Sequence, residues 1–292
     1  MHVAGYWTPN TGPLQCISTF ARRRSLTMAN PETFCTFPMN TSSDGAMPAL
    51  LLAAGRGERM RPLTDSTPKP LLPVRGKPLL QWRMEALLQG GFEHAVINTA
   101  WLGEQIEAQF GNAFCPPGAR PMQLSYSREG RDFGQALETA GGICRALPLL
   151  GDAFWVMAGD VFAPDFVFSQ SDVQRFLARD RLAHIWLVPN PQHNPGGDFG
   201  LDAQSGLALN CPKDSPLPRL TFSTIGLYRR ELFLPPWCDV PPGNPEGQRL
   251  ALAPLLRAAM DGQRVSAQLY TGAWTDVGTP ERLACLNADN PT

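Results

Sequence analysis

Residues 50–74 read LLLAAGRGERMRPLTDSTPKPLLPV, an apolar run followed by glycines and basic residues. Its five leading apolar residues predict a buried strand that ends at Gly55, with Gly57 two positions further on. Glycines after a strand let the backbone approach an anion closely, and free N–H groups there form an anion-binding concavity. Arg59 and Lys69 follow and can supply cations to phosphate oxygens. The stretch therefore predicts a phosphate-binding loop at the end of the first strand.

This loop differs from two common phosphate-binding patterns. It lacks the G-x-x-x-x-G-K-[ST] sequence of a P-loop, and Met60 stands where a dinucleotide-binding G-x-G-x-x-G needs its third glycine. By spacing alone, a tight turn surrounded by solvated arginines is the alternative interpretation.

Outward from this loop, apolar runs alternate with helical patterns. The alternation predicts β–α–β units and a mainly parallel sheet covered by helices on both faces. Ligands of such sheets bind beyond the carboxyl ends of the strands, so Gly55 and Asp160 lie at the expected functional edge. Residues 190–249 contain short segments separated by proline and glycine, the pattern of hairpins and long loops. We expect strands over 48–53, 94–99, 122–127, 154–157, 184–188 and 265–270, and helices over 78–89, 103–110, 139–147, 172–178, 250–259 and from Pro280.

Composition argues against several classes of function. The formal net charge of the 292-residue chain is −1, which does not suit a binder of nucleic acid or of anionic membranes. No apolar run reaches the length of a membrane span. The seven cysteines include no C-x-x-C pair and the four histidines are scattered, so neither a zinc site nor a disulfide framework is indicated. We expect reduced thiols and a cytoplasmic protein.

The first 46 residues differ from the rest of the chain. They contain the arginine triplet 22–24 among Thr, Ser, Pro and Asn residues, with no hydrophobic periodicity. Because such a composition cannot bury a core, we expect a disordered extension, with the fold beginning near Met47.

The motifs resemble those of a known enzyme family. The segment LLAAGRGERMRPLTDSTPKPLLPV resembles the signature of the sugar-1-phosphate nucleotidylyltransferases, and GKPLLQW, LETAGGI, AGDVF and WTDVGTPERL follow in the family's order. The resemblance covers residues 48–287. It implies a single-domain, Rossmann-like α/β fold with a mainly parallel mixed sheet flanked by helices, plus a small β-rich sugar-binding subregion. Within residues 47–290, the nucleotide-binding half would span about 47–165 and the sugar-binding half about 166–290.

Within this family, the chain shares most with the uridylyltransferases that act on N-acetylmuramate α-1-phosphate in peptidoglycan recycling. The segments GRGERMRPLT, NPQHNPGGDFGL and LTFSTIGLY carry this similarity. It implies that an NTP, here UTP, and a sugar 1-phosphate give an NDP-sugar and pyrophosphate, with Mg²⁺ as the cofactor. The implied partners are these small molecules, and the oligomeric state stays open.

The resemblance also implies roles for residues around the phosphates. Arg59 would contact the triphosphate, and Lys69 would bridge the α-phosphate and the incoming sugar phosphate. Asp160 and Asp276 would together hold Mg²⁺, which prefers oxygen ligands and usually takes one or two protein carboxylates. Taken alone, Asp160 also fits a turn residue, and Asp276 fits a residue that shapes the start of the last helix.

Contacts to the nucleotide and the sugar are implied in the same way. Backbone groups of the first strand and the glycine loop would hold the nucleotide: Leu52, Ala53, Ala54, Gly55, Arg56 and Gly57. The sugar site would contain Glu138, Thr139, Gly141 and Asp198. The two carboxylates of this set would bind sugar hydroxyls or the N-acetyl group. Glu138 also suits the start of a helix electrostatically, which is its alternative interpretation.

Other functions stay open on the sequence. Transfer to mannose 1-phosphate, glucose 1-phosphate or phosphocholine would use the same chemistry, and a non-catalytic regulatory subunit would share the fold. Such subunits usually lose the lysine or an aspartate, whereas Lys69, Asp160 and Asp276 are all present. A metal-dependent glycosyltransferase would normally carry a D-x-D pair, whereas GDVF has one aspartate. The chain departs from the muramate branch by extra residues within 131–136 and by Arg128 in place of a proline, which leaves base selection open.

Overall fold

The main sheet is central to the computed structural model, which describes residues 47–212 and 214–288. Its ten strands have the order β10-β11-β13-β9-β12-β7-β1-β4-β6-β5. β1 (Ala49–Leu52) is parallel to β4 (His94–Thr99) on one side and to β7 (Ala153–Ala158) on the other, and β6 (Met122–Arg128) is parallel to β4. This part of the sheet therefore has the predicted parallel arrangement. The expected extension over residues 1–46 lies outside the described residues.

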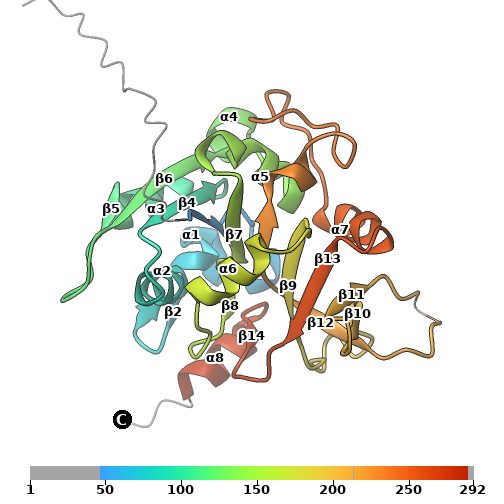
Figure 1. The fold of residues 1–292 in the computed structure, drawn as a ribbon. Coiled ribbons are helices and arrows are strands. Elements are labelled where there is room, and N and C mark those ends of the chain that lie inside the picture. Colours follow the sequence, from blue (N-terminus) through green and yellow to red (C-terminus); the bar gives the residue numbers. More distant parts are fainter. Residues whose placement is uncertain (1–46, 213, 289–292) are drawn as a thin grey trace, which may run out of the picture. The chain divides into compact units, whose positions relative to one another are not determined.

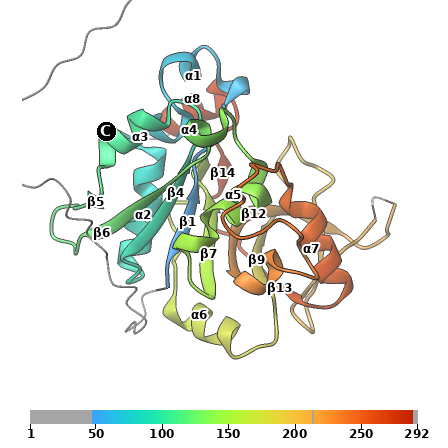
Figure 2. The same cartoon turned by 90° about the horizontal axis from the view of Figure 1, so that it is seen from above.

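Helices cover both faces of this sheet (Figures 1 and 2). The helices of the described residues are α1 (Leu63–Ser66), α2 (Leu79–Gln89), α3 (Gly103–Phe110), α4 (Glu129–Phe133), α5 (Glu138–Ala146), α6 (Gln170–Leu177), α7 (Leu252–Asp261) and α8 (Pro280–Ala288). α3 coincides with its predicted bounds, and the other predicted helices begin and end close to theirs. The α/β fold class predicted from the sequence is confirmed.

Neighbouring residues of β1 pack against opposite layers of helices. Leu50 belongs to a core that also contains side chains of α5 and α7, whereas Leu51 belongs to a core that contains side chains of α2, α3 and α6. Both leucines are fully buried. Because strand side chains alternate between faces, a strand buried on both faces must be a continuous apolar run. This requirement explains why the central strand could be recognised from the sequence.

The second half of the sheet is mostly antiparallel. Its strands are β9 (Ala183–Val188), β10 (Phe199–Asp202), β11 (Leu207–Leu209), β12 (Arg219–Arg229) and β13 (Val265–Leu269). β10 and β11 form an antiparallel hairpin, as the sequence predicts for this region. β13 is parallel to β9, whereas β12 is antiparallel to both β7 and β9. The complete sheet is therefore mixed.

β12 was not predicted as a long strand, because residues 190–249 resemble hairpins and loops. It spans 11 residues and joins the two halves of the sheet by pairing with β7 and β9. Its register against β9 shifts between Phe222 and Gly226, and Thr224 has a left-handed φ of 66°. This irregularity interrupts the alternation of apolar and polar residues that identifies a strand.

Four short strands of the described residues lie outside the main sheet: β2 (Pro73–Val74), β3 (Lys77–Pro78), β8 (Val161–Phe162) and β14 (Thr275–Asp276). A fifth short strand, β5 (Ala113–Phe114), is the edge strand of the main sheet beside β6. β8 and β14 pair with each other, and β2 pairs with β3. Over the described residues, no helix is long and apolar enough to cross a bilayer.

Candidate active site

A pocket of about 230 Å³ opens at the carboxyl end of β1, the edge where the sequence predicts ligand binding. Eight of the predicted site residues line it: Leu52, Ala53, Ala54, Gly55, Lys69, Glu138, Thr139 and Asp160. Its other lining residues are Pro70, Asn98, Glu129, Ala136 and Ala158. The predicted residues Arg56, Gly57, Arg59, Gly141, Asp198 and Asp276 are outside this lining.

The glycine loop is held in shape by Thr64. Gly57 has a left-handed φ of 67°, and a Cβ atom there would lie 2.9 Å from Thr64 Cγ2. The Thr64 hydroxyl donates a hydrogen bond of 2.8 Å to the Gly57 carbonyl. Gly55, in contrast, has open space where a Cβ would be, beside the pocket. The conformation of the loop therefore requires glycine at position 57, whereas the absence of a side chain at Gly55 leaves open space beside the pocket.

The two arginines of the loop have different surroundings. The Arg56 guanidinium lies 3.6 Å from the centroid of the Trp101 ring and donates to the Thr64 carbonyl at 2.9 Å. These contacts orient Arg56 toward the base of the loop. Arg59 lies exposed in the 3₁₀ helix Glu58–Met60. The roles implied for both arginines toward the nucleotide stay predictions.

Lys69 and Asp160 meet in the pocket. The Lys69 ammonium donates a hydrogen bond of 2.6 Å to Asp160 Oδ2. The side chain of Lys69 is 10% exposed and that of Asp160 is 40% exposed. The lysine side chain is therefore mostly enclosed by protein, whereas the carboxylate is accessible from the pocket. This geometry places a fixed cation and a solvent-accessible carboxylate at the end of the glycine loop.

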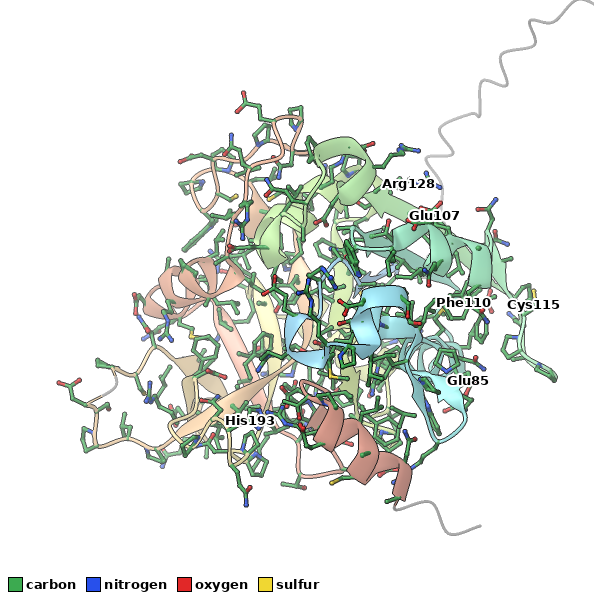
Figure 3. The ribbon with its side chains drawn as sticks, turned by 180° about the vertical axis from the view of Figure 1, so that it is seen from behind. Glu85, Glu107, Phe110, Cys115, Arg128 and His193 are labelled. Atoms are coloured by element: carbon green, nitrogen blue, oxygen red, sulfur yellow. The ribbon has the colours of Figure 1, made fainter. Side chains whose placement is uncertain are left out.

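The chain segment that carries Asp276 lies directly beside Asp160. In the antiparallel β8–β14 pair, Asp276 is opposite Val161, and the N–H of Val277 donates to the Asp160 carbonyl at 2.9 Å. The Asp276 carboxylate accepts a hydrogen bond from Arg282 and lies 2.9 Å from His193 Nε2. The structure therefore brings the backbones of the two predicted metal ligands together. Figure 3 shows His193 in the segment beside α8.

A buried arginine of α2 holds the β8 strand of this pair in place. Arg83 of α2 is 1% exposed and donates from Nε to the Val161 carbonyl at 3.1 Å and from Nη1 to the Ala163 carbonyl at 3.2 Å. Burial lowers its pKa to about 10. Arg83 thus anchors β8, the strand that follows Asp160, by charge-assisted hydrogen bonds to backbone carbonyls.

A buried polar network forms another wall of the pocket. The Ala53 N–H donates to Asn98 Oδ1 at 2.6 Å, and Asn98 Nδ2 donates to Glu129 Oε1 at 2.7 Å. The other Glu129 oxygen accepts from the Leu137 N–H at 2.8 Å. Burial raises the pKa of the Glu129 carboxyl, and these hydrogen bonds together with the Arg145 charge oppose that change. The network joins the ends of β1 and β4 to the starts of α4 and α5.

Sequence reasoning missed Asn98, Glu129, His193, Arg282 and Arg83. One of them carried a usable signal, because Asn98 is a polar residue near the carboxyl end of an apolar strand beside the glycine loop. Glu129, His193 and Arg83 depend on contacts between segments far apart in the chain, as in the His193–Asp276 and Arg83–Val161 pairs, whereas Arg282 contacts Asp276 only 6 positions away.

The predicted sugar-site residues are held in different ways. Glu138 starts α5 with a left-handed φ of 60°, and its carboxylate accepts from Arg249 at 3.0 Å. A Cβ at Gly141 would lie 2.5 Å from the Gln248 carbonyl, so this glycine permits close packing of the segment before α7. Asp198 Oδ2 accepts from the Phe222 N–H at 2.8 Å, which ties Asp198 to β12. Glu138 and Thr139 face the pocket, whereas the contacts of Gly141 and Asp198 are structural.

Arg128, one of the departures noted in the sequence, lies away from this pocket. Its guanidinium forms a two-pronged ion pair with Glu107 of α3, with Nη2 2.7 Å from Glu107 Oε2 (Figure 3). This hydrogen bond is the main cause that raises the pKa of Arg128. Arg128 therefore links the end of β6 to α3.

Comparison with known proteins identifies the class of protein that this fold and pocket define. Residues 48–201 match the family described as nucleotidyl transferase. The chain belongs to this family and is a nucleotidyltransferase.

The relatives narrow this assignment. The chain is 47% identical over 238 residues to the N-acetylmuramate alpha-1-phosphate uridylyltransferase of Neisseria meningitidis, which spans 81% of this chain and 95% of the relative. It is 30% identical over 251 residues to the protein of the same name from Caulobacter vibrioides, which spans 82% of this chain and 95% of the relative.

Solved structures show the same fold at low identity. A candidate glucose-1-phosphate thymidylyltransferase from Bacillus anthracis has a TM-score of 0.66 and 21% identity, with coverage of 85% of this chain and 97% of that chain. The inositol-1-phosphate CTP transferase from T. maritima has a TM-score of 0.59 and 16% identity, with coverage of 85% and 99%. These neighbours confirm the Rossmann-like α/β fold.

Proposed function

We propose that the protein transfers a uridylyl group from UTP to N-acetylmuramate α-1-phosphate, giving the UDP-sugar and pyrophosphate. The name of the Neisseria relative, at 47% identity, supports the two substrates. The observation that carries the reaction type is the contact of 2.6 Å between Lys69 and Asp160 beside the glycine loop. A cytoplasmic role in peptidoglycan recycling follows from these substrates and is part of the proposal.

A site for this reaction must mainly stabilise the negative charges of the reacting phosphates. An oxygen of the sugar phosphate attacks the α-phosphorus of UTP, and the bond from that phosphorus to the bridging oxygen of the β-phosphate breaks. The attacking phosphate is already ionised, so no general base is required. The repulsion among the phosphate oxygens must instead be offset by fixed cations and by positioning. Lys69 is placed for this role, because its side chain is 10% exposed and its ammonium is fixed beside the pocket by Asp160.

The residues around Asp160 and Asp276 fit a magnesium ion. Mg²⁺ prefers oxygen donors and commonly takes one or two carboxylates together with substrate phosphates. Asp276 of β14 lies opposite Val161, the residue after Asp160, and over the described residues no group of three or more His, Cys, Asp or Glu side chains could hold a metal by itself. Bound there, the ion would neutralise charge on the phosphates. Asp276 would then exchange a contact with Arg282 or His193 for the metal.

The buried network positions the nucleotide end of the pocket. Asn98 and Glu129 connect the Ala53 N–H to the start of α5. The pocket wall formed by Ala53 and Asn98 and the wall formed by Glu138 and Thr139 are therefore held in one hydrogen-bonded unit. Such a unit can orient a bound base without movement of the backbone during the reaction.

Pyrophosphate release from purified protein tests the proposal. Each of ATP, CTP, GTP and UTP is combined with N-acetylmuramate α-1-phosphate, N-acetylglucosamine 1-phosphate, mannose 1-phosphate and glucose 1-phosphate, with and without EDTA. We expect the highest kcat/KM for UTP with the muramate substrate, and loss of activity with EDTA. Higher kcat/KM for another pair would replace the proposed substrates, and release that EDTA does not affect would remove the metal from the proposal.

A further inference from the structure

A second cavity adjoins the nucleotide pocket. Its volume is about 430 Å³, and it shares Leu52, Glu138, Thr139 and Ala158 with the first pocket. The rest of its wall comes mainly from the β10–β12 region and from the start of α7, with aromatic and aliphatic side chains such as Phe199 and Phe222. A ligand in the nucleotide pocket can therefore extend a substituent into this second cavity.

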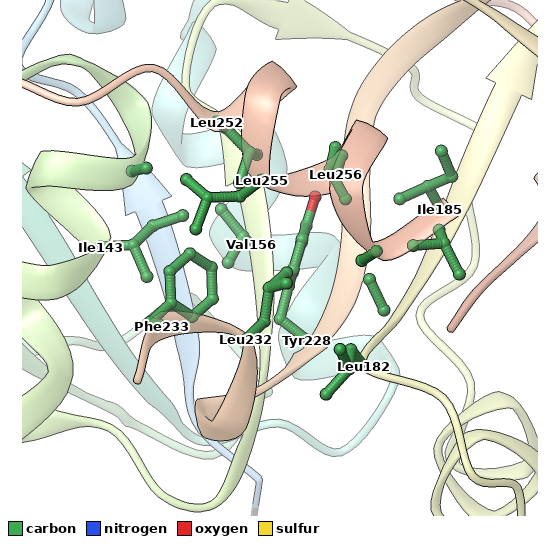
Figure 4. Packing of buried hydrophobic residues seen from close by; sticks show 14 of the residues in the cluster. Ile143, Val156, Leu182, Ile185, Tyr228, Leu232, Phe233, Leu252, Leu255 and Leu256 are labelled. Carbon is green, nitrogen blue, oxygen red and sulfur yellow. The ribbon is translucent and has the colours of Figure 1, made fainter. Parts of the chain in front are cut away.

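Two buried hydroxyls on this wall have no hydrogen-bond partner among the described residues: Tyr228 Oη and Thr224 Oγ1. Tyr228 is 1% exposed, and Figure 4 shows its oxygen directed toward α7. Thr224 lies at the register shift of β12 with its left-handed φ of 66°. Buried polar groups are nearly always paired, and an unpaired hydroxyl lowers stability. A ligand in the cavity would give these two hydroxyls the partners that the described residues do not supply.

The third polar feature of the cavity is the N-terminus of α7. Ala251, the N-cap residue, and Leu252 and Ala253, the first two residues of this ten-residue helix, line the cavity. Among the described residues, no side chain caps this end of the helix. The N-terminus of a helix presents free N–H groups and a partial positive charge, which favour an anion.

We infer that this cavity recognises a short carboxylate-bearing substituent on the sugar of the acceptor. The apolar walls would contact its carbon stem, and its carboxylate would accept hydrogen bonds from Tyr228, Thr224 and the first turn of α7. This inference rests on the proposed function and deepens it. The lactyl ether of N-acetylmuramate has this chemistry, whereas N-acetylglucosamine carries a hydroxyl at the same ring position.

The alternative occupant is a neutral acyl or alkyl group, which the apolar walls would accept equally well. Two observations favour the carboxylate. The hydroxyls of Tyr228 and Thr224 can each donate to an acceptor oxygen, and a carboxylate offers two charged acceptor oxygens, whereas an alkyl group offers none. In addition, the start of α7, which no described side chain caps, favours an anion over a neutral group, and the charge of Glu138, the carboxylate residue on the shared wall, is offset by its ion pair with Arg249.

The test compares two acceptors that differ at this substituent. kcat/KM with UTP is measured for N-acetylmuramate α-1-phosphate and for N-acetylglucosamine 1-phosphate, and their ratio is the readout. Tyr228→Phe removes one hydroxyl, and Ala253→Asp adds a like charge at the helix start. We expect each variant to lower the ratio by about tenfold or more, since a hydrogen bond to a charged group is lost or opposed.

Two matched controls separate charge at the cavity from other effects. Ala253→Asn has nearly the shape of Ala253→Asp without its charge, so it should lower the ratio much less. Ala258→Asp adds the same charge at an exposed position of α7 outside the cavity and should leave the ratio unchanged. Equal ratios in the wild type, Tyr228→Phe and Ala253→Asp would overturn the inference.

A binding measurement keeps this test independent of the proposed reaction. If the wild-type protein released no pyrophosphate with either acceptor, the proposed function would fail. Calorimetric binding of N-acetylmuramate α-1-phosphate would then decide the inference: weaker binding to Ala253→Asp than to Ala253→Asn supports it. Equal binding to these two variants, or no binding to the wild type, overturns it.

Discussion

Lys69 Nζ lies 2.6 Å from Asp160 Oδ2, although the two residues are 91 positions apart in the chain. The first follows the glycine loop and the second follows β7, a strand that pairs directly with β1. Parallel pairing of these strands brings their carboxyl ends together and thereby creates the contact. A cation from one segment and a carboxylate from another are thus fixed at the mouth of one pocket.

Removal of the Lys69 charge should impair catalysis more than folding. We expect Lys69→Met to lower kcat by about 100- to 1,000-fold, as loss of one preorganised electrostatic contact typically does. The side chain of Asp160 is 40% exposed and can be hydrated without its partner, so the Tm should change little. Lys77→Met is the matched control, because Lys77 forms an ion pair with Glu85 outside the pocket. Near-normal kcat in Lys69→Met would contradict the assigned role.

Loss of the Asp276 carboxylate should weaken the affinity for magnesium. For Asp276→Asn we expect the Mg²⁺ concentration at half-maximal activity to rise by about tenfold or more. A direct readout is the rise in Tm when Mg²⁺ and UTP are added, because a ligand that binds the folded state stabilises it. That rise should be smaller in the variant. Asp165→Asn, at an exposed position near β8, should behave as the wild type, and the same behaviour in Asp276→Asn would exclude Asp276 as a ligand.

The two glycines of the loop should respond differently to alanine. Gly57→Ala imposes a left-handed φ of 67° on alanine and places Cβ 2.9 Å from Thr64 Cγ2, so we expect a loss of about 1–3 kcal/mol in the free energy of unfolding. Thr64→Ser, which removes that methyl group and keeps the hydroxyl, should recover part of the loss. Gly55→Ala should leave the Tm unchanged, because its Cβ meets no atom within 4 Å, but should raise the KM for UTP. Urea unfolding and steady-state kinetics separate the two effects, and equal losses of stability would contradict this distinction.

Titration of Glu129 should appear in the pH dependence of stability. Burial raises the pKa of this carboxyl above its ordinary value of 4.5, so the folded protein holds the proton more tightly than the unfolded chain does. The stability from this group is therefore present below the ordinary pKa and is lost as pH rises through the folded value. Between about pH 4 and pH 7, the free energy of unfolding of the wild type should fall relative to that of Glu129→Gln. Urea unfolding over this pH range gives the difference, and a difference that rises with pH would show the opposite pKa change.

Tyr228 should reveal a conflict between stability and specificity. Its hydroxyl is buried without a partner among the described residues, so Tyr228→Phe should raise the free energy of unfolding by about 1 kcal/mol in the absence of ligand. If the Tyr228 hydroxyl had no role in binding, Tyr228→Phe would gain this stability and would keep the wild-type ratio of kcat/KM for the two acceptors. Chemical denaturation without ligand measures the first effect. A loss of stability in the variant would indicate that the hydroxyl is satisfied in the folded protein.

The sequence determined the elements whose signals are local. The continuous apolar run at Leu50–Leu52 predicted a central parallel strand, and the glycines that follow predicted the loop beside the pocket. Asp160 lies at the end of an apolar strand and Lys69 lies in the stretch that contains the glycine loop, whereas the roles of both residues came from the resemblance to the enzyme family. The helices with clear periodicity were found because that periodicity is a local signal.

Contacts between residues far apart in the chain could not be predicted from local patterns. β12 was not recognised because the register shift at Phe222–Gly226 interrupts its pattern, yet pairing with β7 and β9 makes it a central strand. The contacts of His193 with Asp276, and of Asn98 with Glu129, join segments that have no periodic relation in the chain. Hydrophobic periodicity reports the face that a residue presents to the core, whereas the pairing of polar side chains depends on how strands and helices are arranged in space.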